Sequence, residues 1–323
     1  MNTFTLRHID ASRDLEWIAP LISSVDVEPT SITELSEWYE RKLPDNIHLR
    51  VAEDEADEQL GFYSLYRYHA GAQMRFRFYL IVEPACRRQG VGAALYEHLE
   101  ELALSLKADG ITTDIRDNDP EGRRFAEKRG FIQKSHDIQM MLELASFNEE
   151  PYSTSMAALT AQGFRFTNMA ELGNDEEAQR KLFELNNSVT ATQPGHNGIP
   201  SWSSFEEFQR TVCQMPWYQP AGQMVVIDTS TGEWAAMSAI TRFENADHAY
   251  NLFTGVDPRY RGRKLGQSVK ALALCHARDH LGVDRVHTNH NADNDPMIAI
   301  DRKLGYVQIP GTCRMEKTLN GNE

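Results

Sequence analysis

Two short segments of the chain combine basic residues, glycines and the start of a helical pattern, which together suit the binding of a phosphate group. The first reads V-E-P-A-C-R-R-Q-G-V-G-A-A-L over 82–95, and the second reads V-D-P-R-Y-R-G-R-K-L-G-Q-S-V over 256–269. In both, a hydrophobic strand pattern stops at an acid-proline pair, and a basic loop leads into a helix. The free N–H groups and the dipole at a helix start attract phosphate, and glycine lets a ligand approach the main chain. Each segment is therefore a candidate site for a phosphate-bearing cofactor.

The two segments lie at a constant separation along the chain. A distance of 174 residues separates Pro84 from Pro258, and the same distance separates Gly92 from Gly266. A repeat of this length predicts two copies of a whole domain, and 323 residues are enough for two domains. We place the linker in the polar, proline-terminated stretch 145–151, which gives domains at 1–146 and 147–323.

Hydrophobic periodicity predicts the elements that hold the two segments. In the first half we expect a strand at the start, helices at 15–24 and 32–42, strands at 47–52, 59–68 and 73–82, a helix at 91–108, a strand at 111–115, a helix at 122–129 and a strand at 139–144. In the second half we expect a helix at 153–162, a strand at 164–168, a helix at 175–188, a long loop at 191–204, strands at 223–228, 234–243 and 249–256, a helix at 266–281, a strand at 285–288, a helix at 296–304 and a closing strand. Hairpins followed by a β-α-β-α-β order predict an α+β (mixed α/β) fold, with two tandem domains that each have a mostly antiparallel central sheet flanked by helices.

The composition is that of a globular protein and argues against several kinds of partner. Apolar residues make up 41% of the chain and charged residues 25%, and the formal net charge is −14. A surface this negative repels nucleic acid and anionic membranes, and no run reaches the roughly 18 apolar residues of a membrane helix. The four cysteines show no spacing typical of a disulfide framework or a zinc site. Because the N-terminus also lacks a signal-peptide core, we expect a cytoplasmic protein with no nucleic-acid, membrane or metal partner.

Further motifs follow each loop in the same order. Both copies carry D-N-D-P, at 117–120 and 293–296, and both later end a helix on glycine plus an aromatic residue, at 130–131 and 305–306. With these motifs the chain resembles the GNAT acetyltransferase superfamily, whose acyl-CoA signature [Q/R]-x-x-G-x-[G/A] is met in full by residues 87–92. Residues 261–266 meet it except at Lys264. The family's later asparagine, eleven residues before the glycine, matches Asn294, whereas in the first copy the asparagine lies twelve residues before.

The resemblance implies two tandem domains of this family, with acetyl-CoA as the acyl-donor substrate. The pyrophosphate would lie on each loop, and the pantetheine arm would enter a gap between the strand before the loop and the strand after its helix. The residues that it assigns to the cofactor are Val82, Arg87, Arg88, Gln89, Gly90, Val91 and Gly92 in the first copy, and Val256, Arg261, Gly262, Arg263, Lys264, Leu265, Gly266 and Asn294 in the second. In such folds a substrate amine attacks the thioester directly, so the site must orient two reactants, polarise a carbonyl and accept a proton.

The sequence departs from the family at the tyrosine that many members place four residues before the second glycine. The position holds Ala126 in the first copy and Asp301 in the second. Our catalytic candidates are Tyr250, Asn294 and Asp301, although Asp301 can also be a plain polar helix residue and Tyr250 a packed strand aromatic. The identity of the residue that accepts the proton of the amine, the general base, also stays open.

Glu83 and Asp257 precede the motif prolines, where turn and capping roles are the simpler interpretation. His287 and His290 are three apart in a predicted strand, so they should face opposite sides, which argues against a metal site.

The sequence thus predicts an acyl-CoA-dependent N-acetyltransferase that acts by direct attack on an amine of a small molecule. We favour the C-terminal copy as catalytic because it keeps the Asn294 spacing and carries the loop 191–204 with nearby aromatic residues, and the reverse assignment stays open. The alternative is a CoA-binding regulatory or scaffold protein without turnover, which the missing tyrosine supports. A nucleotide-binding module that takes a ligand other than CoA is the third possibility.

Overall fold

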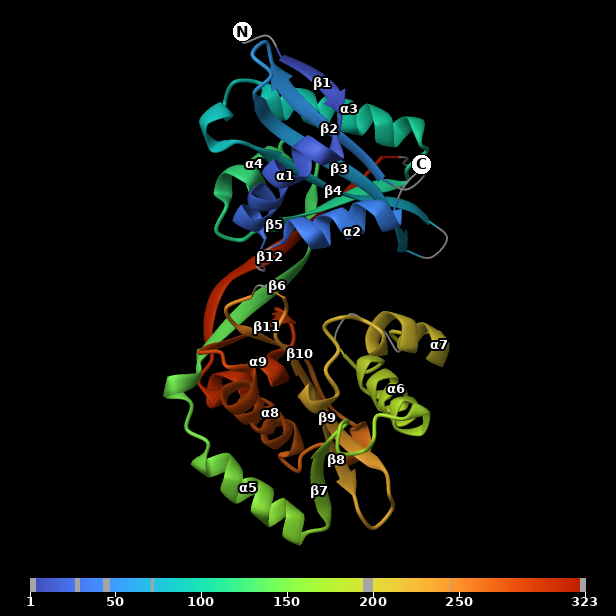
Figure 1. The fold of residues 1–323 in the computed structure, drawn as a ribbon, viewed down its shortest axis with the longest axis vertical. Helices are drawn as coiled ribbons and strands as arrows, with labels where there is room; N and C mark the ends of the chain where they lie inside the picture. Colours follow the sequence, from blue (N-terminus) through green and yellow to red (C-terminus); the bar gives the residue numbers. More distant parts are fainter. Residues whose placement is uncertain are drawn as a thin grey trace. The chain divides into compact units, whose positions relative to one another are not determined.

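The computed structural model describes residues 4–26, 30–42, 47–70, 73–193, 200–244 and 246–319. They form two compact units, drawn in Figure 1. Unit 1 comprises Met1–Asp137 and Pro310–Glu323, and unit 2 comprises Ile138–Ile309. Each unit combines a central sheet with helices, so the predicted α+β class and the predicted pair of domains are confirmed. Among the described residues, no helix has the length and apolar character needed to cross a bilayer.

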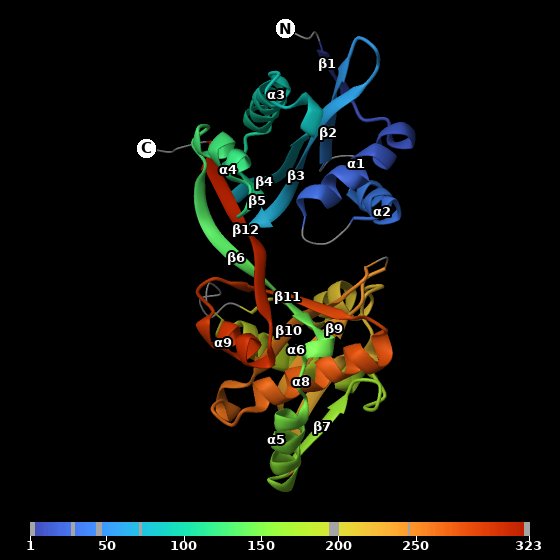
Figure 2. The ribbon, with the colours of Figure 1, turned by 90° about the vertical axis from the view of Figure 1, so that its left-hand side faces the viewer.

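Unit 1 is a sheet with two helices on each face. Its strands are β1 (Phe4–His8), β2 (Ile47–Asp54), β3 (Gln59–Ala70), β4 (Gln73–Val82), β5 (Gly110–Arg116) and most of β12 (Val307–Thr318), in the order β1-β2-β3-β4-β5-β12. All neighbours in this order are antiparallel except β4 and β5, which are parallel. The helices are α1 (Ala11–Val25), α2 (Ile32–Lys42), α3 (Val91–Ser105) and α4 (Pro120–Glu127). Figure 2 shows α1 and α2 on one side of the sheet and α3 and α4 on the other.

The alternation of side chains along the strands produces these two layers in unit 1. Phe62 and Ile81 pack with α1 and α2, whereas their neighbours Tyr63 and Leu65 on β3 and Phe78 on β4 pack with α3 and α4. Successive side chains of a strand point to opposite faces, so both faces of these strands are buried. The sheet is therefore the middle layer that fixes the position of every loop at its edges.

Unit 2 repeats the same architecture. Its strands are the last part of β6 (Ile132–Glu143), with β7 (Phe164–Asn168), β8 (Gln223–Asp228), β9 (Trp234–Thr241), β10 (Ala249–Val256) and β11 (Arg285–Asn291), in the order β6-β11-β10-β9-β8-β7. Its helices are α5 (Glu150–Ala161), α6 (Glu176–Thr190), α7 (Phe205–Phe208), α8 (Leu265–His276) and α9 (Asp295–Leu304). One apolar cluster lies between the sheet and α5, α8 and α9, and another lies under α6 and α7. Figures 1 and 2 both show α5 beside α8.

Short turns of tighter or wider helix connect these elements. The 3-10 turns are η1 (Pro84–Cys86), η2 (Leu144–Ser146), η4 (Pro220–Gly222) and η5 (Pro258–Tyr260), and the π turns are η3 (Gln209–Cys213) and η6 (Ala277–Leu281). Of the loop predicted at 191–204, residues 194–199 lie outside the described residues. Three aromatic residues near it, Trp202, Trp217 and Tyr218, belong to or pack against the cluster under α6 and α7.

The compact units differ from the predicted division at 146/147, because the last strands of the two copies are exchanged. The strand β12 closes the second copy in the sequence, but it pairs antiparallel with β5 of unit 1, from Thr312 opposite Arg116 to Thr318 opposite Gly110. The last strand of the first copy, β6, contributes residues 138–143 to unit 2, where it is the neighbour of β11. The sequence repeat and the compact units therefore have different boundaries. Periodicity along the chain indicates only the boundary of the repeat.

Candidate functional site

Each predicted phosphate loop follows the end of a strand and a short 3-10 turn. In unit 1, β4 ends at Val82, η1 follows, and α3 begins after Gly90; in unit 2, β10 ends at Val256, η5 follows, and α8 begins after Lys264. The prolines at 84 and 258 occupy the first positions of the 3-10 turns, where a missing N–H and a fixed φ suit a helix start. The fold thus places both loops at a helix N-terminus, as predicted from the sequence.

The two loops have left-handed residues at the same two positions. In unit 1 these are Arg88 (φ 64°) and Gly90 (φ 93°), and in unit 2 they are Gly262 (φ 78°) and Lys264 (φ 64°). Glycine therefore occupies the second of these two positions in unit 1 and the first in unit 2. A residue other than glycine in this conformation costs about 1–2 kcal/mol, so both loops carry some strain. Lys264 preserves the course of the backbone and adds a positive charge at the entrance of α8.

The arginine that opens each signature secures the loop to the strand before it. The Nε atom of Arg87 donates to the carbonyl oxygen of Val82 at 3.1 Å, and the Nε atom of Arg261 donates to that of Val256 at 3.4 Å. These are equivalent contacts, 174 residues apart. Both residues are exposed at the surface, and the guanidinium of Arg261 also donates to the hydroxyl of Thr192.

The other predicted cofactor residues fall into two groups. Val91 and Leu265 are buried at 2% and 1% exposure, so only their main-chain N–H groups can serve a ligand at the loop. Among the polar ones, Gln89 donates to the carbonyl of Ala85 at 3.0 Å, and Arg263 stacks over Phe164 and Tyr260. Arg88 forms an exposed ion pair with Glu121 of α4. The side chains of these loops thus mainly fix the loop, which leaves the backbone as its common ligand surface.

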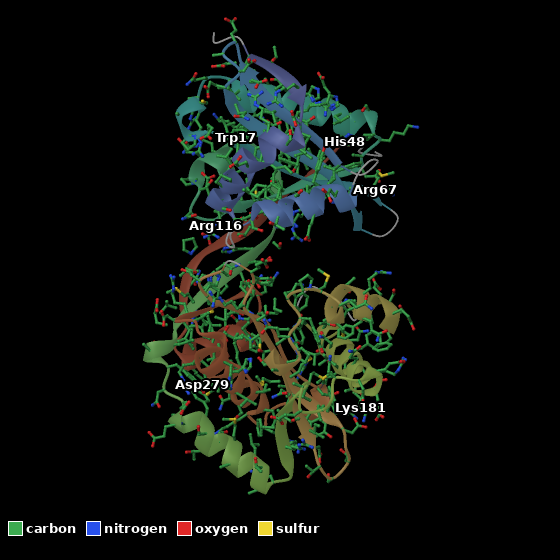
Figure 3. All side chains as sticks on the ribbon, viewed as in Figure 1. Trp17, His48, Arg67, Arg116, Lys181 and Asp279 are labelled. Carbon is green, nitrogen blue, oxygen red and sulfur yellow. The ribbon has the colours of Figure 1, made fainter. Side chains whose placement is uncertain are left out.

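A cleft of about 530 Å³ opens beside the loop of unit 1. The parallel strands β4 and β5 pair only from Arg75 opposite Gly110 to Arg77 opposite Thr112. Beyond that point both strands line the cleft, with residues 78–82 on one side and 113–116 on the other. Figure 3 labels Arg116, which stands at the end of β5 and lines the cleft. The remaining wall comes from the loop and from α3 and α4, so the gap expected for an extended cofactor arm is present.

Unit 2 has a smaller cleft of about 340 Å³ in the same place. Here the parallel strands pair only through Ala249 opposite Val286 and Tyr250 opposite His287. Residues 254–256 of β10, the loop 260–267, the first turns of α9 and the end of α6 form the lining. Of our catalytic candidates, Asn294 is the one that lies in this wall, at the start of α9.

The two units differ in the strand that precedes the loop. In unit 2 the register of β10 with β9 shifts between Asn251 and Phe253, so Leu252 is an extra residue in the ladder. In unit 1 the register of β4 with β3 is continuous from Gly61 opposite Val82 to the hairpin. A bulge leaves its extra residue unpaired and turns main-chain groups away from the ladder. Of these two ladders, only that of β10 with β9 therefore has such an irregularity beside the gap.

Our other two catalytic candidates lie apart from the lining of the unit 2 cleft. Tyr250 is partly exposed on β10, and its hydroxyl donates to the side-chain oxygen of Asn289 at 2.9 Å. Asp301, in α9, has no exposed surface, so it cannot contact a substrate directly. Its carboxylate contacts Lys270 of α8 and lies 2.5 Å from Nε2 of His290 of β11.

Lys270 and Tyr306 complete this buried group; Tyr306 is the aromatic residue of the motif at 305–306, whereas Lys270 was not identified from the sequence. Lys270 is fully buried in the apolar face of α8, and its ammonium lies 4.9 Å from the ring centre of Tyr306. Burial lowers the pKa of Lys270, although Asp301 opposes this. Burial alone would raise the pKa of Asp301, but the charge of Lys270 and the bond from His290 hold it below its ordinary value. The sequence signal that could have indicated this buried group is a lysine among the apolar residues of a helix.

The acidic residues before the prolines act in local structure. Glu83 accepts a hydrogen bond from the indole of Trp17 at 2.8 Å, and Asp257 accepts bonds from the main chain and the side chain of Arg259, both at 2.9 Å. Burial would raise the pKa of Asp257, and the bonds from Arg259 hold it below its ordinary value. Asp257 thus caps η5, whereas Glu83 stands at the N-cap position of η1 without a side-chain capping bond.

The histidines of β11 lie on opposite faces of the sheet, as their spacing predicted. His287 stacks on His248 at 3.8 Å between ring centres, whereas His290 faces Asp301. Among the described residues, no group of three or more histidine, cysteine, aspartate or glutamate side chains is arranged to hold a metal ion.

Comparison with known families and proteins matches both halves. Residues 45–133 match the family described as "Acetyltransferase (GNAT) domain", and residues 189–306 match the "Acetyltransferase (GNAT) family". Among curated relatives, the mycothiol acetyltransferase of Geodermatophilus obscurus is 28% identical over 241 residues, which cover 71% of this chain and 70% of the relative. That of Mycolicibacterium smegmatis is 26% identical over 229 residues, covering 70% of each.

Solved structures of similar fold extend over nearly the whole chain. A tandem GNAT protein from the clavulanic acid biosynthesis pathway has a TM-score of 0.71 and 19% identity, and the match covers 99% of this chain and all of that one. A GCN5-related N-acetyltransferase from Sphaerobacter thermophilus has a TM-score of 0.72 and 17% identity, with 98% and 96% coverage. At these identities the likeness shows the fold alone.

Proposed function

Because the chain belongs to the GNAT acetyltransferases, with one domain of that family in each half, we propose that it transfers an acetyl group from acetyl-CoA to an amine of a small molecule. The family takes its acyl group from acyl-CoA. Acetyl as the group and an amine as the acceptor are our proposal, supported by relatives named mycothiol acetyltransferases over 70% of the chain. The net charge of −14 favours a cationic acceptor through long-range attraction.

We assign the transfer to unit 2, and the observation that carries this assignment is the bulge at Leu252 in β10. Acyl transfer develops negative charge on the thioester oxygen, which preorganised N–H donors stabilise. A bulge turns main-chain groups beside the gap, so an N–H there can be directed at that oxygen, whereas the N–H groups that β4 donates to β3 are engaged in a continuous ladder. The continuous ladder of β4 and β3 in unit 1 suits binding without transfer.

The loop of unit 2 supplies the rest of the donor site in this proposal. The N–H groups that open α8, together with Lys264, suit the pyrophosphate, and the separation of β10 from β11 suits the pantetheine arm. Asn294 lines the same cleft and is the proposed polar contact for that arm. Tyr250, partly exposed on β10, is the proposed contact for the acceptor. The amine then attacks the thioester carbon, the carbon–sulfur bond breaks, and the proton of the amine passes to the thiolate.

The second candidate function is CoA binding without turnover, and one observation favours it for unit 1. Its cleft has the larger volume and is lined at the inner end by apolar and aromatic side chains, including Phe125 and Ala126. Such an apolar wall suits the binding of an acyl-CoA. Unit 1 would then stabilise the protein in response to the level of the cofactor.

The test compares Gly92→Trp with Gly266→Trp by the release of free thiol from acetyl-CoA over a panel of small amines. A Cβ at Gly92 would lie 3.4 Å from Val82, and one at Gly266 would lie 3.2 Å from Val256, so a tryptophan would fill either cleft from the same point. We expect Gly266→Trp to lower turnover at least 100-fold and Gly92→Trp to keep at least half of it. Thermal unfolding checks that both variants fold.

Equal losses in the two variants would refute the assignment to unit 2. Absence of turnover with every amine, together with calorimetric binding of acetyl-CoA, would refute the transferase proposal and favour a CoA sensor. Turnover that is lost only in Gly92→Trp would move the reaction to unit 1.

A further inference from the structure

Lys270 and Asp301 lie one helical turn deeper than residues that line the unit 2 cleft. On α8, Gly266 lines the cleft and Lys270 follows four residues later; on α9, Met297 lines it and Asp301 follows four residues later. Residues four apart share a helix face. The buried charges therefore lie behind the cleft lining, one turn further along the same helix faces.

The internal repeat shows independently that the equivalent positions of unit 1 form its cleft wall. With the separation of 174 residues in α8, and of 175 after it, the buried group of unit 2 corresponds to four residues of unit 1 that all line its cleft: Tyr96, Ile115, Ala126 and Phe131. Their counterparts in unit 2 are Lys270, His290, Asp301 and Tyr306. The positions that give unit 1 a neutral inner wall thus hold a buried ionic group in unit 2.

The fold does not require these charges. Lys270 and Asp301 are both fully buried, and replacing a buried ion pair with apolar residues of similar volume is often neutral or stabilising. Unit 1 shows that Tyr96 and Ala126 fill the same two positions of the same scaffold. A purpose outside stability therefore accounts best for the buried ionic group of unit 2.

His290 is the member of the group with the most access to the outside. Its side chain is 10% exposed, whereas Lys270 and Asp301 have none and Tyr306 has 3%. An ionised carboxylate only accepts hydrogen bonds, so Asp301 holds the proton of the imidazole on Nε2. The second nitrogen, Nδ1, then carries a lone pair and has no recorded partner among the described residues.

We propose that His290 is the proton-transfer residue of unit 2 and that Asp301 and Lys270 are its positioning residues. The inference rests on the proposed function. As the amine nitrogen bonds to the thioester carbon, Nδ1 of His290 takes the proton that the nitrogen loses. As the carbon–sulfur bond breaks, the imidazolium returns that proton to the thiolate, so the products are the amide and free CoA thiol. Lys270 balances the charge of Asp301 in the dry interior, so that the carboxylate can hold the imidazole in place.

The first test is His290→Gln, because the glutamine amide keeps a donor toward Asp301 but has no basic nitrogen. With the full chain and an amine that wild-type protein acetylates, we expect kcat to fall about 100-fold, within the range of general acid–base catalysis, and KM for acetyl-CoA to change less than twofold. His136→Gln is the matched control. It removes another histidine hydrogen-bonded to an aspartate, Asp117, at 3.0 Å in unit 1, and it should keep wild-type kcat.

The second test separates positioning from folding. Asp301→Asn alone would leave Lys270 buried without a counter-charge, so the variant to make is Lys270→Tyr with Asp301→Ala, the pair that unit 1 already contains. We expect it to fold, to bind acetyl-CoA with unchanged Kd, to lose at least tenfold in kcat and to shift the acidic limb of the kcat–pH profile. His290 faces Asp301 of α9, which contacts Lys270 of α8, and Lys270 in turn faces Tyr306, just before β12. A merely structural role would change the melting temperature and leave kcat and its pH profile as in wild type.

The outcomes distinguish this inference from the function on which it rests. If wild-type protein acetylates an amine, Gly266→Trp abolishes the activity and His290→Gln keeps kcat within twofold of wild type, then the role of His290 is refuted and the function stands. If wild-type protein acetylates no amine in the panel, both are refuted.

Discussion

Replacing Lys264 with glycine should make unit 2 more stable and at the same time weaken its binding of acetyl-CoA. Lys264 has φ 64° at the start of α8, and a side chain in this conformation costs about 1–2 kcal/mol. Glycine removes that cost but adds about 0.5–1 kcal/mol of unfolded-state entropy. The net gain is about 0–1.5 kcal/mol, which for a unit of about 170 residues raises the melting temperature by up to about 6 °C.

The loss of the ammonium group should lower the affinity for acetyl-CoA, although the same substitution raises the stability. Lys264 is exposed, and an exposed ion pair contributes about 0.2–1 kcal/mol, so Kd for acetyl-CoA should rise by up to about fivefold. The difference should shrink at high salt, because screening weakens exposed pairs. Calorimetric titration in a Gly92→Trp background isolates the site of unit 2, and differential scanning calorimetry measures the stability.

Two companion variants separate backbone from charge. Lys264→Asn keeps a residue that tolerates the left-handed region but has no charge, so it should lose affinity with little change in melting temperature. Arg88→Gly makes the matching backbone change in unit 1. A fall in the melting temperature of Lys264→Gly would refute the left-handed geometry of the loop. An unchanged Kd would refute the contact between the ammonium and phosphate.

Two further predictions concern stability. Gly255→Ala should destabilise unit 2 by about 1–3 kcal/mol through overpacking, because its Cβ would lie 2.3 Å from Cγ1 of Val189; adding Val189→Ala should recover most of the loss in urea unfolding, and additive losses would contradict the contact. Asp14 is fully buried and accepts bonds from Arg7 at 2.7 and 2.8 Å, so Asp14→Asn should cost unit 1 about 3 kcal/mol. Burial would raise the pKa of Asp14, but Arg7 holds it below 3.8, so its contribution is present above about pH 4 and is lost as the pH falls through the folded pKa. Urea unfolding between pH 2 and 6 should therefore show a weaker acid dependence in the variant, and an unchanged dependence would refute this role of Asp14.

The local parts of the site could be predicted from the sequence. The strand, proline, basic loop and helix form within a dozen residues, so the segments at 82–95 and 256–269 carried all the information needed to place the loops at helix starts. Element boundaries shifted where capping decided them: the predicted helix at 15–24 begins at Ala11, because Asp10 caps it by accepting from the N–H of Ser12. The predicted helix at 266–281 ends as a π turn from Ala277.

The long-range parts could not be predicted. The exchange of β12 and β6 leaves the hydrophobic pattern of each strand unchanged, since either sheet buries it equally well. The bulge at Leu252 depends on pairing with β9 and has no signal within β10. The group around Asp301 joins residues from α8, β11 and α9, and a single charged residue in an amphipathic helix is ordinarily solvated. The sequence therefore showed Asp301 as a polar helix residue and gave no reason to connect it to Lys270.

The exchanged strands also affect the order in which the protein is completed during synthesis. Unit 2 is a continuous stretch, Ile138–Ile309, whereas unit 1 needs both Met1–Asp137 and Pro310–Glu323. As a chain grows from its N-terminus, unit 2 has all of its strands before the last strand of unit 1 has been translated. Unit 1 is translated first and is finished last, and until then the edge of β5 that receives β12 lacks its partner. An open strand edge invites pairing with other chains, so the nascent protein depends on β12 for protection against aggregation.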